Sequence, residues 1–407
     1  MTYFKNIETS IKDSANLDAF SRLRISNPTN VFDAQMTYDL KPTLYEQIVT
    51  GAGAAIAHDA TNRMAGMTFA ATTVGGKAYM QTYEYFSYQP MKSQLIAVTF
   101  NMIEQVANAL KFAGYSDGVN GIEFQNTGTA NQIVIYSGTT LGAQTILQSA
   151  WNLDKLDGTG SSGITLDITK AQILIIDFQA LYVGRVRVGF DIGGNIIYVH
   201  EFSHANSVVY PYIQSANLPI RCGMVATGTT TTTMKFICAA VASEGGQDNT
   251  SSFNFSQTRG VSAGNATETH LFSLRAKPTF NSITNRSRII IEDFQISVTG
   301  ANPVWWKLVI GQALTTPSWT DVNATYSATQ YDQTGTLSGS PAIVIRQGYV
   351  PATVQVKDSV TNLVTSRYPL ALDSTGTNRN LGQIGILVQG IGGVSQCYGA
   401  LNWREIQ

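Results

Sequence analysis

The stretch YVGRVRVGFDIGGNIIYV, residues 182–199, predicts a β-hairpin. In its first half Val186 and Val188 alternate with Arg187, which is the period of two of a strand with one buried and one solvated face. The Gly-Gly-Asn at residues 193–195 supplies the positive φ angles of a tight hairpin turn. We therefore expect the chain to reverse there and to return as a second strand.

Short segments of the same kind recur along the chain. Each is rich in β-branched or aromatic residues and is bounded by Gly, Asn, Asp or Ser; examples are QLIAVTFNM, GIEFQ, QIVIYSG, QILIIDF, MKFICAAVAS, RSRIIIEDFQISVTG, VWWKLVIGQAL, AIVIRQGYV and IGILVQGI. Regular short strands separated by turn residues are typical of sandwiches and barrels. The sequence therefore predicts an all-β fold of two antiparallel β-sandwich domains of the jelly-roll-like kind.

Two irregular stretches set the expected domain boundaries. GGQDNTSSFNFSQTRGVSAGNAT, residues 245–267, is polar, rich in Gly and nearly free of aliphatic side chains. Near the N-terminus, SANLDAFSRLRISNPTNVFD contains Pro28, which prevents a regular continuation and favours an extended arm. The expected organisation is an extended N-terminal arm over 1–28, a jelly-roll or concanavalin-like sandwich over 29–245, a linker over 246–266 and a second sandwich over 267–407.

The composition of the chain limits which binding partners are expected. Charged residues make up 13% of the chain and the formal net charge is -1, so no electrostatic field attracts nucleic acid or an anionic membrane, and neither is an expected partner. Apolar runs are far shorter than the roughly 20 residues of a membrane-spanning helix, and the N-terminus lacks the apolar core of a signal peptide. The three cysteines, Cys222, Cys238 and Cys397, are odd in number and widely spaced, which indicates unpaired, mostly buried thiols made in a reducing cytoplasm.

One motif raises the question of metal chemistry. YVHEFSHANS contains His200, Glu201 and His204 in the H-E-x-x-H order of zinc proteases, which place both histidines on one face of a helix. Here the preceding residues are β-branched or aromatic and follow a Gly-Gly turn, so a strand is expected instead. We predict no metal site, no cofactor and no catalytic residue, with His200 and His204 bonding loop backbone groups.

A weak glycan-contact hypothesis rests on three tryptophans, Trp305, Trp306 and Trp319. Apolar rings suit the faces of pyranose sugars. Because Trp305 and Trp306 alternate sides in a strand, one of the two is expected in the core.

The chain also resembles a known family. The segment WNLDKLDGTGSSGITLDITKAQILIIDFQALYVGRVRVGFDIGGNIIYVHEFSHAN (Trp151–Asn206), the following PYIQSANLPIRC, the arm DAFSRLRIS and the closing NWREI are similar to segments of virion structural proteins of tailed bacteriophages. The resemblance implies β-sandwich folds of the jelly-roll or concanavalin-like kind and carries no catalytic residues across. It does not separate a head, neck or tail location.

These observations lead to a functional expectation. The chain is expected to be a non-enzymatic virion component, made in the host cytoplasm, that forms a homo-oligomer and docks onto neighbouring capsid, neck or tail proteins. The expected docking element is the arm, because extended segments can add to a neighbour's sheet edge; its residues are Phe20, Arg22, Leu23, Arg24 and Ile25. The alternative is a receptor- or glycan-binding module of the same particle that contacts a host surface glycan.

Overall fold

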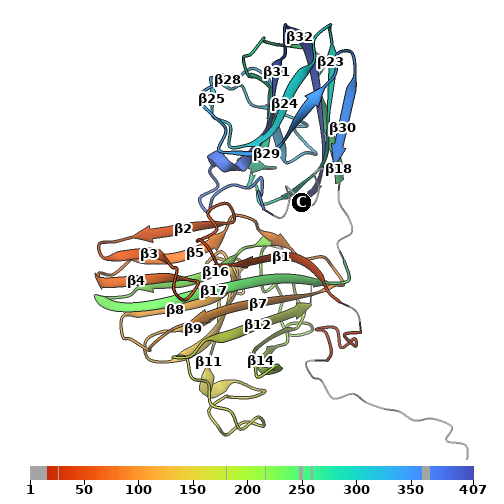
Figure 1. Ribbon diagram of the computed structural model, residues 1–407. Coiled ribbons are helices and arrows are strands. Elements are labelled where there is room, and N and C mark those ends of the chain that lie inside the picture. The colour runs from red at the N-terminus through yellow and green to blue at the C-terminus, as the bar shows by residue number, and fades with distance from the viewer. Residues whose placement is uncertain are drawn as a thin grey trace, which may run out of the picture.

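The computed structural model describes residues 16–25, 27–179, 181–215, 217–246, 251–257, 260–359 and 367–407. Figure 1 shows two β-sandwiches, the second standing above the first at the side where β2 (Tyr45–Thr50) and β5 (Lys77–Thr82) lie. We call them the first unit (β1 to β17) and the second unit (β18 to β32). Within the described residues helix is limited to the short 3-10 segments η1 (Gln148–Ala150) and η2 (Asn380–Gly382). The expected all-β fold of two antiparallel sandwiches is confirmed.

The first unit consists of two facing antiparallel sheets. The eight-stranded sheet has the order β14-β13-β12-β7-β17-β4-β3, with β1 also paired to β17; its strands are β1 (Thr29–Gln35), β3 (Ala54–Asp59), β4 (Met64–Thr72), β7 (Ser93–Asn101), β12 (Gln172–Gln179), β13 (Val186–Ile192), β14 (Asn195–Phe202) and β17 (Thr230–Glu244). The seven-stranded sheet has the order β11-β10-β9-β8-β16-β5-β2; its strands are β2 (Tyr45–Thr50), β5 (Lys77–Thr82), β8 (Ala109–Ser116), β9 (Gly121–Asn126), β10 (Asn131–Tyr136), β11 (Gln144–Leu147) and β16 (Ile220–Ala226). The short strands β6 (Phe86–Ser87) and β15 (Asn217–Leu218) pair beside them.

The predicted hairpin is β13 and β14. Ile192 pairs with Asn195 across Gly193 and Gly194, whose φ angles are 65° and 83°, as a primed turn requires. The inward side chains of β13 enter the core between the sheets, where the ring of Phe190 lies 5.1 Å from that of Phe124 on the opposite sheet. Each such buried side chain contributes about 1.5–3 kcal/mol by its removal from water.

The second unit repeats this construction with its own core. Its five-stranded sheet, β18-β32-β23-β30 with β19 on β32, faces a six-stranded sheet of order β26-β27-β20-β31-β24-β29. The first consists of β18 (Ser251–Ser256), β19 (Val261–Ala263), β23 (Arg288–Thr299), β30 (Gln355–Ser359) and β32 (Ser395–Ile406); the second of β20 (Thr269–Ala276), β24 (Val304–Ile310), β26 (Thr320–Asp321), β27 (Thr329–Asp332), β29 (Ile343–Val350) and β31 (Gln383–Gly390). Two small hairpin pairs are β21 (Thr279–Phe280) with β22 (Ile283–Thr284) and β25 (Leu314–Thr315) with β28 (Thr336–Leu337).

Part of the expected linker over 246–266 is wrong. Strands β18 and β19 lie inside this range and both pair with β32. Phe253 and Phe255 of β18 pack against the core of the second unit, because they alternate with the polar residues that face outward. The second unit therefore begins at β18, earlier than residue 267.

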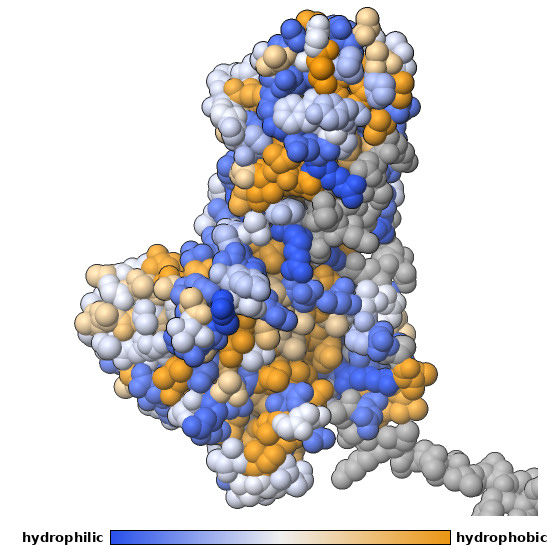
Figure 2. Space-filling model, in the orientation of Figure 1, coloured by the Kyte–Doolittle hydropathy of each residue, from blue (hydrophilic) through white to orange (hydrophobic). Residues whose placement is uncertain are grey.

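Other features follow the expectations from composition. All three cysteines are unpaired, and Cys222 and Cys397 are buried, as predicted. The face seen in Figure 2 intersperses hydrophilic and hydrophobic residues over both units. No helix in the described part of the chain has the length and apolar character needed to cross a membrane.

Candidate functional site

The described part of the arm, residues 16–25, lies on the first unit and is held there mainly through its backbone. Arg187 donates a hydrogen bond to the Leu17 carbonyl oxygen over 2.8 Å, and Gln179 donates to the Ala19 carbonyl oxygen over 3.0 Å. The Ala19 N–H in turn donates to the Ser93 hydroxyl oxygen over 3.2 Å. The arm thus covers the outer face of β7, β12 and β13.

Under the arm lies a buried ionic group that we call the arm cluster; it consists of Arg24, Asp177, Arg187, Tyr198 and Glu244. The Arg24 guanidinium binds the Asp177 carboxylate at 2.7 Å and the Glu244 carboxylate at 2.6 Å. Asp177 also accepts hydrogen bonds from Arg187 and from the Tyr198 hydroxyl, the latter at 2.8 Å. Each member comes from a different part of the chain, so the cluster joins the arm to β12, β13, β14 and β17.

The electrostatics of the arm cluster are those of a closed structural site. Asp177 is 0% exposed and Arg187 is 1% exposed, and two guanidinium groups face two carboxylates. Burial disfavours the charge of Arg24, but the Asp177 carboxylate and the Glu244 and Tyr198 contacts outweigh it and raise the pKa of Arg24. Buried charges are tolerated when they are paired and hydrogen-bonded in this way.

The structure divides the five predicted arm residues between two roles. Arg24 belongs to the arm cluster, and Arg22 pairs with Asp18 while lying 5.0 Å from the ring of Phe20. Leu23 and Ile25 instead face outward and are 51% and 87% exposed. The five residues do not form one contact surface, because the described arm folds back on itself and is not extended. Leu17 bridges Leu23 across a turn in which the Ser21 N–H donates to the Asp18 carbonyl oxygen over 2.9 Å.

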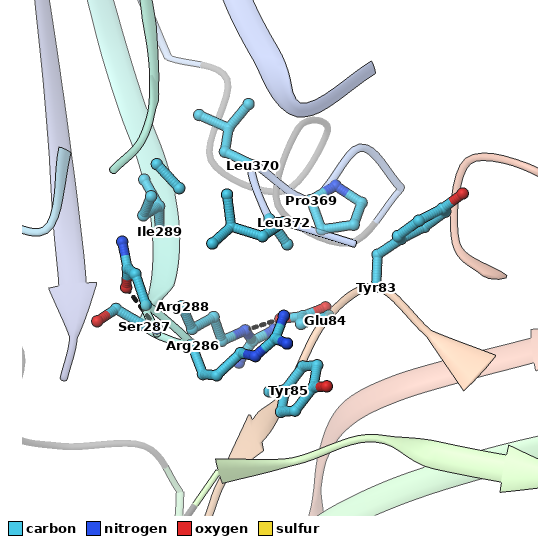
Figure 3. Close-up of a pocket in the computed structure, with 13 residues that line it drawn as sticks. Tyr83, Glu84, Tyr85, Arg286, Ser287, Arg288, Ile289, Pro369, Leu370 and Leu372 are labelled. Atoms are coloured by element: carbon cyan, nitrogen blue, oxygen red, sulfur yellow. Dashed lines mark hydrogen bonds and ion pairs between the residues drawn. The ribbon is translucent and has the colours of Figure 1, made fainter. Parts of the chain in front are cut away.

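A second set of contacts joins the two units (Figure 3). Glu84 and Arg288, both largely buried, form an ion pair across the junction, and Arg288 also donates to the Val31 carbonyl oxygen over 3.2 Å. Burial raises the pKa of Glu84, and the facing Arg288 works against that rise. The guanidinium of Arg286 lies 4.2 Å from the ring of Tyr85. The pocket between these side chains holds only about 10 Å³, which is room for about one water molecule and not for a ligand.

The stretch with the H-E-x-x-H order is the end of strand β14, as expected, and His204 lies in the loop after Phe202. His200 and Phe202 of β14 point to the same side, with ring centres 4.5 Å apart. His200 accepts a hydrogen bond from the Asn152 N–H at 3.2 Å, and His204 bonds the Gly184 carbonyl oxygen at 2.9 Å. No group of three or more His, Cys, Asp or Glu side chains in the described residues is placed to hold a metal ion.

The three tryptophans are not brought together. Trp306 is in the core of the second unit, which confirms that one of the adjacent pair is buried. Trp305 pairs with Gln389 of β31, whereas Trp319 stacks on Arg275, which pairs with Gln383 at the other end of the same strand. Six residues of strand separate these positions by about 20 Å. The three rings therefore do not make one platform.

Carboxylates on the outer face of the seven-stranded sheet bear on hydrolysis of glycans. Glu123 lies 3.4 Å from the Arg221 guanidinium, which is 4.5 Å from the ring of Tyr79. In the same row across the sheet, Glu46 stands four strands from Glu123, a distance of about 19 Å. Glycosidases need two carboxyl groups about 5–9.5 Å apart, and these two do not meet that spacing.

The fold defines the class of the chain: an all-β protein of two antiparallel β-sandwich units with separate cores. Solved structures that overlap with it include arcelin-5, a lectin-like defence protein from Phaseolus vulgaris (13% identity, 54% of this chain and 99% of that one, TM-score 0.32). A carbohydrate esterase from the Shiga toxin-encoding bacteriophage phi24B (12%, 53%, 99%, TM-score 0.33) and a family 16 glycosyl hydrolase from Mycobacterium smegmatis (11%, 52%, 100%, TM-score 0.34) also overlap. No protein-family model and no curated protein matches the chain.

Several residues of these sites escape sequence reasoning. Asp177 and Glu244 carry no local signal, because their partner Arg24 is 153 and 220 residues away. Glu84 and Arg288 likewise meet only when the two units pack together. The one available signal is Arg187, a charged residue between Val186 and Val188, which points to a partner on the outer face.

Proposed function

We propose that this chain is a non-enzymatic structural component of a tailed-bacteriophage particle, which self-assembles and docks onto neighbouring capsid or tail proteins. The observation that carries the proposal is the arm cluster. It unites the segments in which the sequence resembles virion proteins: Arg24 comes from DAFSRLRIS, Asp177 from QILIIDFQ and Arg187 from GRVRVGF.

The chemistry of the arm cluster supports a structural role. Its charges are paired, and Asp177 and Arg187 are buried, so the group fixes the described part of the arm on the sandwich.

Anchoring the arm gives it a defined outer surface. While Arg24 is held in the arm cluster, the side chains of Leu23 and Ile25 are exposed on the surface of the first unit as an apolar pair. An apolar pair on a fixed backbone loses little conformational entropy on docking, and repeated copies in a symmetric particle would multiply a modest contact.

The test is incorporation into particles. The double variant Leu23→Ser with Ile25→Ser should remain folded and should be depleted at least ~10-fold from purified particles, which corresponds to about 1.4 kcal/mol of docking free energy. Val209→Ser is the matched control, because Val209 is also 87% exposed on the first unit but lies outside the arm. The proposal is wrong if the unaltered chain is absent from particles, or if the unaltered chain, the double variant and Val209→Ser are incorporated equally.

A further inference from the structure

A groove of about 310 Å³ opens on the second unit beside β25. It lies where the outer face of the six-stranded sheet meets the segments before β26 and β31. The side chains that line it include Arg275, Trp319, Asn378, Arg379, Asn380 and Gln383. It is remote from the arm and from the arm cluster, so its role is independent of the structural role proposed above.

The floor of the groove is a flat stack of two groups. The Arg275 guanidinium lies 3.9 Å from the centre of the Trp319 indole ring, and the Gln330 side-chain oxygen accepts from Arg275 at 3.2 Å. These contacts fix both planes, so the platform is ordered before any ligand arrives. The guanidinium covers one face of the half-buried indole, so the other face is the apolar area open to a ligand, with the edge of the guanidinium as a cation behind it.

The residues that line the groove carry positive charge and no negative charge. No Asp or Glu lines it, and Arg275 forms none of the ion pairs between described residues. Burial lowers the pKa of Arg275 to about 10, with Asp332 opposing the shift from a distance. The other cation, Arg379, has its guanidinium against the Tyr83 ring and donates to the backbone oxygens of Pro369 and Thr43. Arg275 is therefore the group that an anion would complement.

Amide side chains surround this platform. Gln383 uses its NH₂ group on the Gln312 carbonyl oxygen, which leaves its own oxygen as an acceptor. Asn378 and Asn380 make no side-chain hydrogen bond with the described residues, so both present donors and an acceptor to the groove. Paired donors and acceptors of this kind suit hydroxyl groups, which both donate and accept.

We propose that this groove binds a sugar that carries a carboxylate. The carboxylate lies against the Nη1/Nη2 edge of Arg275, because Nε and Nη2 donate to the Gln330 oxygen on the other edge. The apolar face of the sugar ring lies against the open face of Trp319. Ring hydroxyls bond the amides of Asn378 and Asn380. A neutral sugar would leave the guanidinium without a counter-charge, and a purely anionic ligand would leave the indole uncovered.

The experiment titrates the full chain, by calorimetry and saturation-transfer NMR, with glucuronic acid and with sialyllactose; glucose and lactose are the uncharged comparisons. The two acidic sugars separate a uronic-acid source from a sialic-acid source. We expect saturable binding of at least one acidic sugar in the millimolar range, as the size of a small sugar implies. The corresponding uncharged sugar should bind at least ~10-fold more weakly.

Substitutions of the groove residues test whether the sugar binds in this groove. Trp319→Ala and Arg275→Lys should each weaken binding at least ~10-fold; the lysine keeps the charge but loses the fork and the stack. Trp305→Ala is the matched control, since Trp305 carries a stacked cation, Lys307, at 4.3 Å on the same sheet about 20 Å away. Thermal unfolding verifies that each variant is folded.

Four outcomes overturn the proposal. They are no saturable binding of either acidic sugar, equal binding of the uncharged sugars, equal losses in Trp305→Ala and Trp319→Ala, and tighter binding of adenosine monophosphate than of the acidic sugars. The last would assign the groove to a nucleotide, whose base and phosphate also suit an indole beside a guanidinium.

Discussion

The guanidinium of Arg24 lies 2.7 Å from the carboxylate of Asp177, although 153 residues separate the two in the chain. The described part of the arm, residues 16–25, is therefore part of the folded first unit. Because Asp177 also serves Arg187 and Tyr198, a single carboxylate holds the arm, β13 and β14 together.

Asp177→Asn should destabilise the first unit by about 3–5 kcal/mol, because it removes the buried charge that the guanidinium groups of Arg187 and Arg24 share. Urea unfolding at neutral pH measures this. Asp39→Asn is the control: Asp39 pairs with Lys41 but is 53% exposed, so its loss should cost less than about 1 kcal/mol. Equal effects of the two substitutions would show that the arm cluster contributes no more than a surface ion pair.

Glu84→Gln should loosen the junction between the two units. The substitution leaves the charge of Arg288 buried without the Glu84 carboxylate and should cost about 3 kcal/mol. Scanning calorimetry should then resolve separate transitions for the two cores, which the intact junction couples. The control Glu292→Gln breaks the half-exposed pair with Arg404 and should leave the scan unchanged. Two separated transitions already present in the unaltered protein would contradict this coupling.

The turn of the β13–β14 hairpin depends on backbone conformation and not on space. Gly194 has a φ of 83°, and a side-chain carbon added there meets no atom within 4 Å. Gly194→Val should nevertheless cost about 1–2 kcal/mol, because a β-branched residue disfavours this region of φ. Gly194→Asn should cost much less, since Asn tolerates it. If both variants have the same free energy of unfolding in urea as the unaltered protein, a side chain at residue 194 does not strain the turn.

Acidification from pH 7 to pH 4 should destabilise the first unit through His200. Burial lowers the pKa of His200 to about 4, against about 6.5 in the unfolded chain. Between these values the unfolded chain binds more protons, so stability is full above pH 6.5 and falls as the pH falls, by up to about 3 kcal/mol. His200→Asn keeps an acceptor for the Asn152 N–H and should flatten this pH dependence in urea unfolding. An unchanged slope would exclude His200 as its source.

Local pattern predicts much of this fold, because strand period and turn chemistry act within a few residues. The β13–β14 hairpin follows directly from the alternation of Val186 and Val188 with Arg187 and from the Gly-Gly turn. The same rule also points to β18, where Phe253 and Phe255 alternate with polar residues. Because the residues around Phe253 and Phe255 are rich in Gly and polar side chains, the sequence predicts a linker there and not a strand.

The sites are less predictable, because they depend on contacts that close only in three dimensions. Arg187 stands on the face of β13 that its pattern assigns to solvent, yet it is 1% exposed, since the arm covers it. Trp319 is recognised as an exposed aromatic candidate, but its partner Arg275 is 44 residues earlier in the sequence. Only the pairing of β20 with β27 and β31 brings the groove residues together.

The position of β17 has a consequence for the order of folding. β17 lies in the middle of the eight-stranded sheet, between β7 on one side and β1 and β4 on the other, yet it is the last strand of the first unit to be synthesised. Until residue 244 has left the ribosome, β1 has no partner and Arg24 has no Glu244 to bind. Closing a sheet through contacts so distant in sequence is slow. The nascent chain therefore lacks Glu244, one of the two carboxylates that bind Arg24, through most of its translation, and the first unit closes only as the second begins to emerge.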